Sequence, residues 1–367
     1  MFGLRLSLVL IAGVAAVNAA TLLQRFEKWA LDFAMEFRDN EHHELVLSKW
    51  AVNDKFIEVT NSKNLTYTVG HNQFSGMDAD EFRAYLGLSG SRNNFASGMS
   101  TLAEVKCLYD CVEHRKEVSK VATIKCVTGC LDQNSLEAKS VPASVNWVTK
   151  GGVTAVKNQG QCGSCWSFST TGSLEGAYFV KYGRLNSFSE QQLVDCDNRK
   201  NGGKDMGCNG GLMDNAFTWI EKNGGLCSEA SYPYVSGTTK TAGTCATTCT
   251  NVPNSKVASY TDVPANSDED MMAALAQQPV SVAIEADQQS FQLYKSGVFT
   301  GTCGTNLDHG VLVVGYGNLS GNDYYLVKNS WGTTWGDEGY IYLGRGPQYN
   351  SGAGQCGVLM QASYPRL

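Results

Sequence analysis

Two cysteines three positions apart precede a tryptophan in the stretch KNQGQCGSCWSF, residues 157–168. Such a pair, here Cys162 and Cys165, can be a redox couple, half of a metal site, or one structural sulfur beside one reactive sulfur. The chain contains 13 cysteines. Because disulfides consume cysteines in pairs, an odd number in a secreted chain leaves at least one thiol over. The residues that surround this thiol decide between the three possibilities.

The choice of an imidazole partner is narrow, because His309 is the only histidine after residue 140. A lone histidine is usually an ordinary surface or core residue, but the sequence around this one favours function. His309 opens the expected strand HGVLVVGYG, and the chain returns after NLSGND as YYLVKNSWG. A hairpin folded about residue 320 places Trp331 opposite His309 and Asn329 two positions away. The amide can hold the imidazole ring and its tautomer, and the indole can cover that contact from water.

Cys165 stands where a helix is expected to begin and to continue to about Lys181. A thiolate is the nucleophilic form of cysteine, and its pKa falls at a helix N-terminus and beside an imidazolium. Gln159 is placed to offer its amide to a developing oxyanion, with the backbone N–H of Cys165 as the second donor. One such donor is typically worth about 3 kcal/mol of barrier. These residues together indicate nucleophilic catalysis by a cysteine.

The other interpretations of the cysteine pair lack support elsewhere in the chain. A thiol–disulfide oxidoreductase would not need His309, Asn329 or Gln159, and it expects its cysteines inside a βαβ unit. A metal site needs further convergent ligands, and one histidine is present downstream. A purely binding relative would have lost Cys165 or His309, whereas both are present.

The elements that must position these residues form a helical half followed by a β half. After about residue 255 the pattern turns to strands, and the clearest are PVSVAIEA, HGVLVVGYG, DYYLVKNSW and GYIYLGRG. The sequence therefore predicts an α+β fold from Val141 onward, with a helical part at about 150–255 and a β part at about 256–360.

The start of the chain has the features of a secretory signal. Residues 1–20 carry Arg5, an apolar run, and small residues before a cleavage position after Ala19 or Ala20. The run is too short for a membrane anchor, and no later stretch approaches the roughly 18 apolar residues of a spanning helix. The net charge of −6 gives no basic footprint for nucleic acid. The secretory route is oxidising and makes Asn64 and Asn318 candidate glycosylation sites.

Residues 21–62 have apolar residues at helical spacing, among them Phe26, Trp29, Ala30, Phe33 and Phe37. The helical period is lost at 67–82, which indicates a short extended piece. Residues 88–100 are rich in Gly, Ser and Asn and read as a linker.

A separate unit at 101–140 contains two cysteine pairs, each spaced i, i+4. Their spacing is what two antiparallel helices that turn near residue 118 require, and it predicts the disulfides Cys107–Cys130 and Cys111–Cys126. A zinc site is the alternative, disfavoured by the oxidising route. The polar linker 131–140 is expected to be exposed to proteolysis.

Four motifs of this chain resemble those of the papain-like cysteine peptidases: QGQCGSCW, GCNGG at 207–211, LDHGV at 307–311 and KNSWG at 328–332. The resemblance covers nearly all of 141–367, and GLMDNAF and NGGLCSEASYPY are similar to the cathepsin L-like branch. It implies a two-lobed fold with the cleft between a helical lobe and a β-barrel-like lobe. It also implies that Cys165 is the nucleophile, His309 the base and acid, Asn329 the orienting residue and Gln159 the oxyanion donor. Gly210 and Gly211 would hold an extended substrate by backbone hydrogen bonds.

The resemblance also implies how the sulfurs pair. Three disulfides are expected from the family: Cys162–Cys208, Cys196–Cys245 and Cys303–Cys356. Cys227 and Cys249 remain and are expected to pair with each other, so Cys165 would be the single free thiol of residues 141–367.

The front of the chain resembles the family's inhibitory propeptide, expected here at 21–100. Trp50, Asn53, Ile57 and Asn61 match the later half of its long helix pattern, and Gly70, Asn72 and Phe74 match the short motif that follows. His42 and Val46 stand where Glu and Arg are usual, and Gly76 replaces the usual Asp. These departures call the propeptide's pH-sensing salt bridges into question.

The expected activity is that of an endopeptidase made as a zymogen, with the mature chain beginning near Val141. The histidine-bearing loop that makes some relatives exopeptidases is lacking, because His309 stands alone after residue 140. The pocket for the second residue before the cleaved bond (P2) would be lined by Leu212, Met213, Ala283, Leu307, Gly310 and Gln361, with Trp331 also on the substrate side. Five of these six pocket residues are apolar or small, so a preference for Leu, Phe or Val over Arg follows.

The resemblance implies no metal and no organic cofactor. The expected partners are protein or peptide substrates, the chain's own propeptide and cystatin-like inhibitors, with no nucleic acid, no membrane and a monomeric mature form. The expected destination is the secretory pathway, ending outside the cell or in a lysosome or vacuole.

Overall fold

The computed structural model describes residues 21–88 and 141–367. The expected signal segment, most of the linker and the Cys107–Cys130 hairpin lie outside the described residues. The described residues up to Leu88 and from Ser144 belong to one compact unit. None of the described helices is long and apolar enough to cross a membrane.

The N-terminal segment contains two long helices rather than the single helical run expected over 21–62. Residues 21–32 form the first, and α2 (Asn40–Asn61) follows after a break. At the break Ala34 takes a positive φ of 50°, and the Asp39 side chain caps α2 by accepting a hydrogen bond from the His42 N–H. Phe33 and Phe37 lie in the break. Their spacing continues the apolar pattern of the helix, although the helix itself has ended.

The next stretch, expected to be extended over 67–82, is a short strand followed by a helix. β1 spans Tyr67–Val69 and α3 spans Ala79–Tyr85. Asp78 and Glu81 form a capping box at the start of α3. This Asp-x-x-Glu pattern is visible in the sequence and is the signal that would have corrected the prediction.

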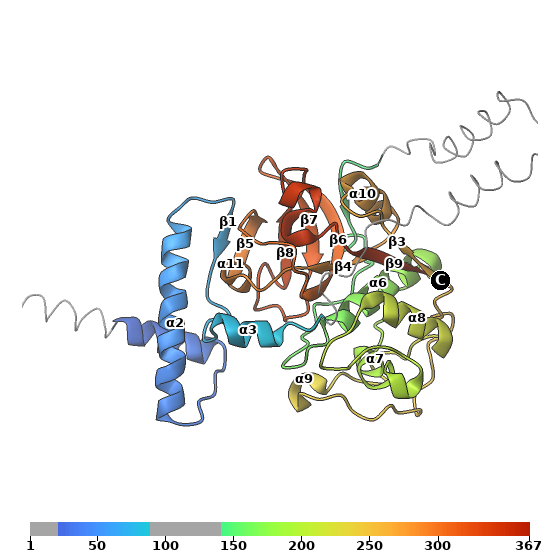
Figure 1. Cartoon of the computed structure of the whole chain (residues 1–367), viewed down its shortest axis with the longest axis horizontal. Helices are drawn as coiled ribbons and strands as arrows, with labels where there is room; N and C mark the ends of the chain where they lie inside the picture. The colour runs from blue at the N-terminus through green and yellow to red at the C-terminus, as the bar shows by residue number, and fades with distance from the viewer. Residues whose placement is uncertain (1–20, 89–140) are drawn as a thin grey trace, which may run out of the picture. The chain divides into compact units, whose positions relative to one another are not determined.

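The later part of the chain follows the expected order of helices and then strands (Figure 1). Its helices are α6 (Cys165–Tyr182), α7 (Glu190–Cys196), α8 (Met213–Asn223), α9 (Ser236–Thr239), α10 (Asp268–Gln277) and α11 (Gln289–Gln292), with short 3₁₀ turns η1 (Arg199–Asn201), η2 (Asn350–Gly352) and η3 (Gln355–Gly357). Its strands are β2 (Val145–Asn146), β3 (Ser259–Asp262), β4 (Val280–Ile284), β5 (Tyr294–Phe299), β6 (His309–Leu319), β7 (Asn322–Lys328), β8 (Tyr340–Gly344) and β9 (Ala362–Arg366).

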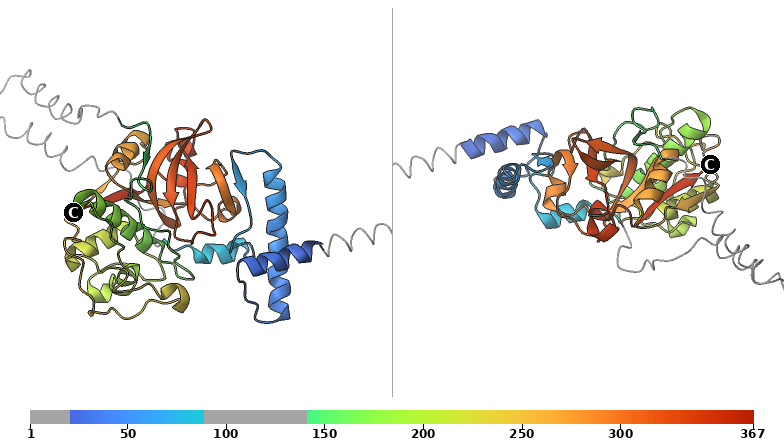
Figure 2. Two further views of the ribbon diagram at one scale, coloured as in Figure 1. Left: turned by 180° about the vertical axis from the view of Figure 1, so that it is seen from behind. Right: turned by 90° about the horizontal axis from the view of Figure 1, so that it is seen from above.

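These strands form one sheet in the order β1-β5-β8-β7-β6-β4-β9-β3, with β2 beside β6. The β5–β8 pair is parallel and the other pairs are antiparallel. The hairpin of β6 and β7 turns at residues 320–321, as the sequence predicted. Figure 2 shows the helices of residues 165–239 gathered on one side of the strands of residues 280–344. The N-terminal segment joins the same sheet, because β1 pairs with β5.

Helix α6 packs against β4 and β6 through a face of small residues. A Cβ added at Gly172 would lie 2.7 Å from Leu312 Cδ2, and one at Gly176 would lie 2.4 Å from Cδ of Pro279. Ser169 on the same face donates its hydroxyl to the carbonyl of Val311 at 2.7 Å. The helix therefore lies directly on the strand that begins with His309.

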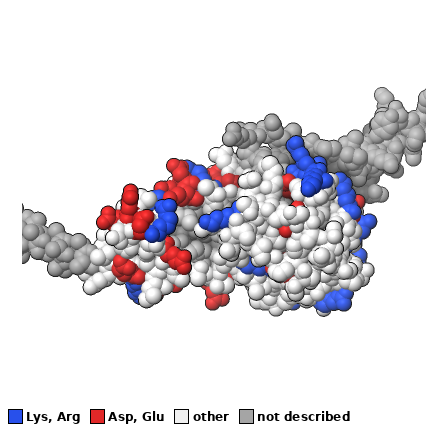
Figure 3. All heavy atoms as spheres, turned by 90° about the horizontal axis from the view of Figure 1, so that it is seen from below, with Lys and Arg blue, Asp and Glu red and all other residues white. Residues whose placement is uncertain are grey.

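The N-terminal segment has its own apolar core of Phe26, Trp29, Ala30, Val46 and Trp50. Its charged side chains lie mainly at the surface, where acidic groups gather over this segment (Figure 3). Where the family has an Arg and an Asp, Val46 and Gly76 meet: a Cβ added at Gly76 would lie 2.7 Å from Val46 Cγ1 and 2.9 Å from Trp29 Cη2. An apolar contact therefore occupies this place.

This contact predicts that Gly76→Asp destabilises the N-terminal segment. The new carboxylate would be overpacked and buried without a partner, which should cost about 3 kcal/mol of unfolding free energy. Urea unfolding of the full chain, carrying Cys165→Ser to remove the thiol expected to be free, measures the loss. Val52→Asp is the control, since Val52 lies on α2 with 65% of its surface exposed. Equal stability changes in the two variants would contradict the prediction.

Candidate active site

Cys165 is the first residue of α6, and its side chain is completely buried. The backbone N–H of Gly310 donates to Cys165 Sγ at 3.3 Å. The N–H groups of Trp166 and of Gly87 also donate to the sulfur. Three backbone dipoles therefore converge on this atom, and one of them comes from the N-terminal segment.

His309, the first residue of β6, is held by Asn329 and Trp331 as the hairpin predicted. Its Nε2 lies 2.8 Å from Asn329 Oδ1, and its ring stacks on Trp331 with centroids 4.6 Å apart. Asn329 Oδ1 also accepts the Ser330 N–H at 2.8 Å, which identifies it as the oxygen. Nε2 must then carry the proton, so the neutral ring presents the lone pair of Nδ1. Nδ1 is buried and has no hydrogen-bond partner among the described residues.

Burial keeps both groups neutral in this state. It raises the pKa of the Cys165 thiol to about 11, although the three N–H groups act in the opposite direction. It lowers the pKa of His309 to about 4, against the hydrogen bond to Asn329. Burial therefore acts against an ion pair of thiolate and imidazolium in this state.

Gln159 is buried and fixed from both ends of its amide. Its Oε1 accepts from the Ser330 hydroxyl at 2.6 Å, and its Nε2 donates to the Cys162 carbonyl at 3.0 Å. The same Nε2 also lies 3.4 Å from the carbonyl oxygen of Tyr85. A backbone carbonyl of the N-terminal segment thus faces the side-chain amide that the sequence predicts as an oxyanion donor.

The segment after α3 lies against the glycine-rich wall of the site. Leu88 forms a parallel bridge with Gly211, and its N–H donates to the Asp308 carbonyl at 3.1 Å. A Cβ added at Gly87 would lie 2.2 Å from the carbonyl carbon of Gly163. These contacts were not expected from the sequence, where residue 88 was assigned to a linker.

The residues expected to line the P2 pocket lie in or beside one apolar cluster. Met213, Ala283 and Leu307 are buried members of it, and Leu88 packs against it. A Cβ added at Gly310 would lie 3.1 Å from Met213 Sδ. Leu212 and Gln361 are half-buried, and the Gln361 carbonyl accepts the Ala283 N–H at 3.0 Å.

The N-terminal segment also covers Trp331. The rings of Phe74, Phe82 and Tyr85 contact the indole edge to face, at centroid distances of 5.3, 5.4 and 6.3 Å. Gln73 donates its Nε2 to the Trp331 carbonyl at 2.7 Å. The indole that shields the His309–Asn329 contact is therefore itself enclosed.

A buried charged network that the sequence did not predict lies behind the site. Lys157 Nζ lies 2.6 Å from Glu190 and 3.3 Å from Glu175. Lys328, next to Asn329, donates to the Thr154 hydroxyl at 3.0 Å, and burial lowers its pKa to about 8. These charged residues are far apart in the sequence and form no local pattern. The network could therefore not be predicted from the sequence.

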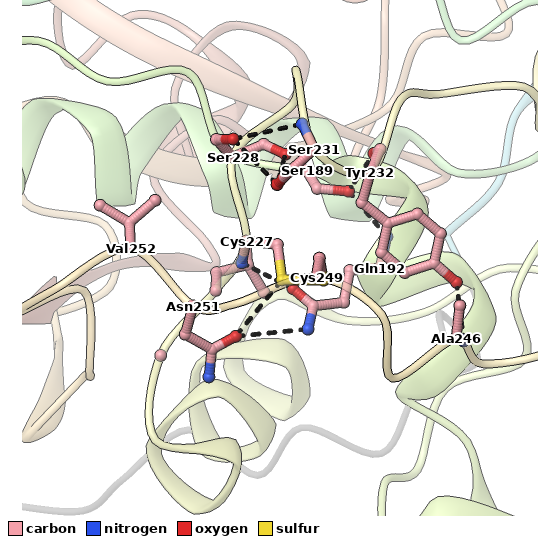
Figure 4. Close-up of a disulfide and its surroundings, with 12 residues drawn as sticks. Ser189, Gln192, Cys227, Ser228, Ser231, Tyr232, Ala246, Cys249, Asn251 and Val252 are labelled. Atoms are coloured by element: carbon pink, nitrogen blue, oxygen red, sulfur yellow. Dashed lines mark hydrogen bonds between the residues drawn. A yellow bond between two sulfur atoms is a disulfide. The ribbon is translucent and has the colours of Figure 1, made fainter.

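Four disulfides join the described residues: Cys162–Cys208, Cys196–Cys245, Cys227–Cys249 and Cys303–Cys356. They are the pairs expected for this part of the chain, and Cys165 is the one free thiol among the described residues. Cys162–Cys208 ties the loop before Cys165 to the GCNGG wall. Near Cys227–Cys249 the side-chain carbonyl of Gln192 accepts the Cys227 N–H at 2.7 Å (Figure 4). Among the described residues no group of three or more His, Cys, Asp or Glu side chains could hold a metal ion.

Comparison with known proteins identifies the family. Residues 141–366 match the papain family of cysteine proteases, and residues 26–82 match the cathepsin propeptide inhibitor domain. The chain belongs to the papain family of cysteine proteases and carries that family's inhibitory propeptide, so it is a proenzyme.

The similarity to its relatives extends over nearly the whole chain. The chain is 39% identical to the senescence-specific cysteine protease SAG39 of Oryza sativa subsp. indica, over 94% of this chain and 91% of that protein. It is 42% identical to the thiol protease SEN102 of Hemerocallis sp., over 94% and 86%. Among solved structures it resembles a recombinant stem bromelain precursor (TM-score 0.75, 35% identity, 95% and 99% covered). It also resembles digestive procathepsin L 3 of the Tenebrio molitor larval midgut (TM-score 0.74, 32% identity, 94% and 99% covered). These neighbours bear out the two-lobed α+β fold preceded by a helical propeptide.

The contact of Gly87 with Gly163 predicts that Gly87→Leu opens the site of the precursor. No side chain fits there, so residues 85–88 must lift away and expose the Cys165 thiol to reagents. The rate of iodoacetamide labelling of Cys165 in the intact precursor, followed by peptide mapping, should rise at least tenfold, about 1.4 kcal/mol of lost protection. Ala84→Leu is the control, because Ala84 is exposed. A Gly87→Leu precursor that labels as slowly as the control would contradict the prediction.

Proposed function

We propose that this proenzyme yields an endopeptidase that cleaves peptide bonds with Cys165, His309, Asn329 and Gln159. The observation that carries the proposal is the arrangement of His309. Its Nε2–H points to Asn329 Oδ1 at 2.8 Å, which leaves the unpartnered Nδ1 as the atom that exchanges protons with the thiol. Cys165 Sγ and the first residue after His309 are in direct contact, since the Gly310 N–H donates to the sulfur at 3.3 Å.

The reaction begins when His309 Nδ1 takes the Cys165 proton and the thiolate sulfur attacks the peptide carbonyl carbon. The carbonyl π electrons move to oxygen, and Gln159 Nε2 with the Cys165 N–H stabilises the resulting oxyanion. As the C–N bond breaks, His309 returns the proton to the leaving amine. Water, deprotonated by His309, then attacks the thioester and releases the acid and the thiolate. Asn329 keeps the ring oriented throughout by accepting from Nε2.

This assignment predicts separate effects for two glutamines. Gln159→Ala should lower kcat of the activated enzyme by about 10²–10³-fold, because it removes one oxyanion donor. Gln161→Ala should leave kcat nearly unchanged, since Gln161 is exposed two positions away. The test uses a fluorogenic peptide, with active sites counted by an irreversible thiol reagent. Cys165→Ala should abolish turnover, and activity that survives it would reject the proposed function.

We further propose that the propeptide inhibits by occupying the site with its own backbone. The Tyr85 carbonyl faces Gln159, the Gly87 N–H faces Cys165, and Leu88 bridges Gly211. Activation then requires removal of this segment, and the mature chain would begin near Val141, where the match to the protease family starts. Residues 1–20 would direct the precursor into the secretory pathway, toward the extracellular space or a lysosome or vacuole.

The packing of Leu88 supports a hydrophobic preference at the P2 pocket. Its side chain contacts the cluster that includes Met213, Ala283 and Leu307, so a leucine of the chain itself already uses this surface. Burial of a leucine or phenylalanine there would contribute roughly 1.5–3 kcal/mol. An arginine would lose hydration without finding a carboxylate, because Gln361 is neutral.

A peptide library should therefore rank Leu, Phe and Val well above Arg at P2. Gln361→Glu should raise kcat/KM for Arg at this position relative to Leu, since the added carboxylate can pair with the guanidinium. Gln348→Glu, which adds the same charge at an exposed position, should leave the ratio unchanged. Arg equal to or better than Leu in the unmodified enzyme would refute the preference.

Cleavage within chains rather than at their ends is supported by the sequence after residue 140. His309 is its only histidine, so it lacks the histidine-bearing loop that closes the cleft of exopeptidases in this family. We also propose that the mature enzyme is a monomer, that it cleaves protein substrates and that cystatin-like proteins inhibit it.

A further inference from the structure

Two buried carboxyl groups, Asp197 and Asp205, lie against each other behind the glycine-rich wall. Asp197 is the C-cap residue of helix α7 and is completely buried, and Asp205 is 3% exposed. Their side chains are within hydrogen-bonding reach of each other. Each nevertheless has one oxygen, Oδ2, that is buried without a partner among the described residues.

The other oxygen of each carboxyl group is satisfied. Asp197 Oδ1 accepts the Lys204 N–H at 3.1 Å. Asp205 Oδ1 accepts the Leu212 N–H at 3.0 Å and the Asn215 side-chain amide at 2.9 Å. The two unpartnered oxygens are thus the only unsatisfied atoms of the pair. Two acceptors cannot bond to each other, but one proton between them makes one group a donor and satisfies both.

The pair is built into the loop that carries the substrate wall. Leu212, whose N–H Asp205 holds, directly follows Gly210 and Gly211. A Cβ added at Gly211 would lie 2.8 Å from Asp205 Cγ, so the carboxyl group is packed directly under this backbone. Asp197 is also packed against backbone, because a Cβ added at Gly203 would lie 1.9 Å from its Oδ1.

We propose that Asp197 and Asp205 share one proton and act as positioning residues that hold the Gly210–Gly211 backbone in place for the peptide substrate. The role in substrate binding rests on the proposed peptidase function. When the proton leaves, two carboxylates face each other in a buried site, and their repulsion displaces the loop. The pair therefore affects KM rather than the chemistry at Cys165.

The surroundings of the pair favour the retained proton. Burial, followed by the charge of Asp197, raises the pKa of Asp205 to about 8. Burial likewise raises the pKa of Asp197. The cation that acts on Asp197 is Lys222 of α8, and Lys204 contributes its backbone N–H. The shared proton is thus retained up to about pH 8.

Two isosteric variants test the shared proton without any need for turnover. Asp205→Asn keeps an oxygen for the Leu212 N–H and donates an N–H to Asp197, and Asp197→Asn does the converse. Other buried carboxyl groups, among them Glu229 and Asp308, also have a raised pKa, so the test is the infrared difference spectrum of the Cys165→Ser precursor minus each variant at pH 7. Both difference spectra should contain the carbonyl band of a buried protonated carboxyl, shifted in D₂O. A difference spectrum without this band overturns the proposal.

The stability of the same proteins gives a second readout that is independent of activity. A folded-state pKa raised from about 3.9 to about 8 stabilises the native state most at low pH. This contribution is lost as pH rises through about 8. The melting temperature of the parent should therefore fall more between pH 5 and pH 9 than that of Asp205→Asn. Parallel curves would overturn the proposal, as would a rise in melting temperature with added calcium at pH 8, which would mean that the pair holds a cation.

Kinetics of the activated enzyme test the positioning role. For an uncharged peptide, KM of the parent should rise several-fold as pH passes through about 8, whereas KM of Asp205→Asn should stay flat and kcat should follow the same profile in both. A parallel rise of KM in both proteins overturns the positioning role. If no variant or parent cleaves peptides, the proposed function fails, and the infrared and melting results still decide the shared proton.

Discussion

The close packing of α6 on strands β4 and β6 is the constraint on which the catalytic arrangement depends. Cys165 begins the helix and His309 begins β6, so the sulfur and the imidazole meet where helix and strand lie against each other. Glycines at 172 and 176 allow this approach, because any side chain would enter Leu312 or Pro279 at under 3 Å. The hydroxyls of Ser169 and Ser173 on the same helix donate to the carbonyls of Val311 and Pro279, which the helix would otherwise leave buried without a partner. Neither element could hold the site alone.

Because Cys165 and His309 are buried where the helix meets the strand, their ionisation depends on access to water. A thiolate and an imidazolium need solvation or dipoles, and three N–H groups reach the sulfur. In the proenzyme these dipoles do not compensate for burial, which favours the neutral forms of both groups. In the proposed mechanism the propeptide would thus keep Cys165 and His309 inactive in two ways: its backbone fills the space of a substrate, and its packing buries both groups and favours their neutral forms.

Much of this site could be predicted from the sequence, because its determinants are local. A short hairpin fixes which residues face His309, and the start of a helix can be seen from its pattern. The break between the two helices of the N-terminal segment was harder to predict. The apolar period continues through Phe33 and Phe37 although the helix has ended. At 67–82 the loss of that period conceals a helix, which the capping box of Asp78 and Glu81 marks. The occupation of the cleft by residues 85–88 could not be predicted, because it depends on a contact between Gly87 and Gly163 that only the folded chain creates.

The ionisation of Cys165 before and after propeptide removal is the measurement that tests this view most directly. Ultraviolet absorbance of the thiolate, taken as the difference between the parent and Cys165→Ser at each pH, follows this one sulfur. In the intact precursor the thiolate should form only near the raised pKa of about 11. In the activated enzyme it should be present well below that, at a pKa of about 7.5 or less, as an ion pair with His309. Titration curves that coincide in the two forms would contradict the idea that burial by the propeptide holds the catalytic pair neutral.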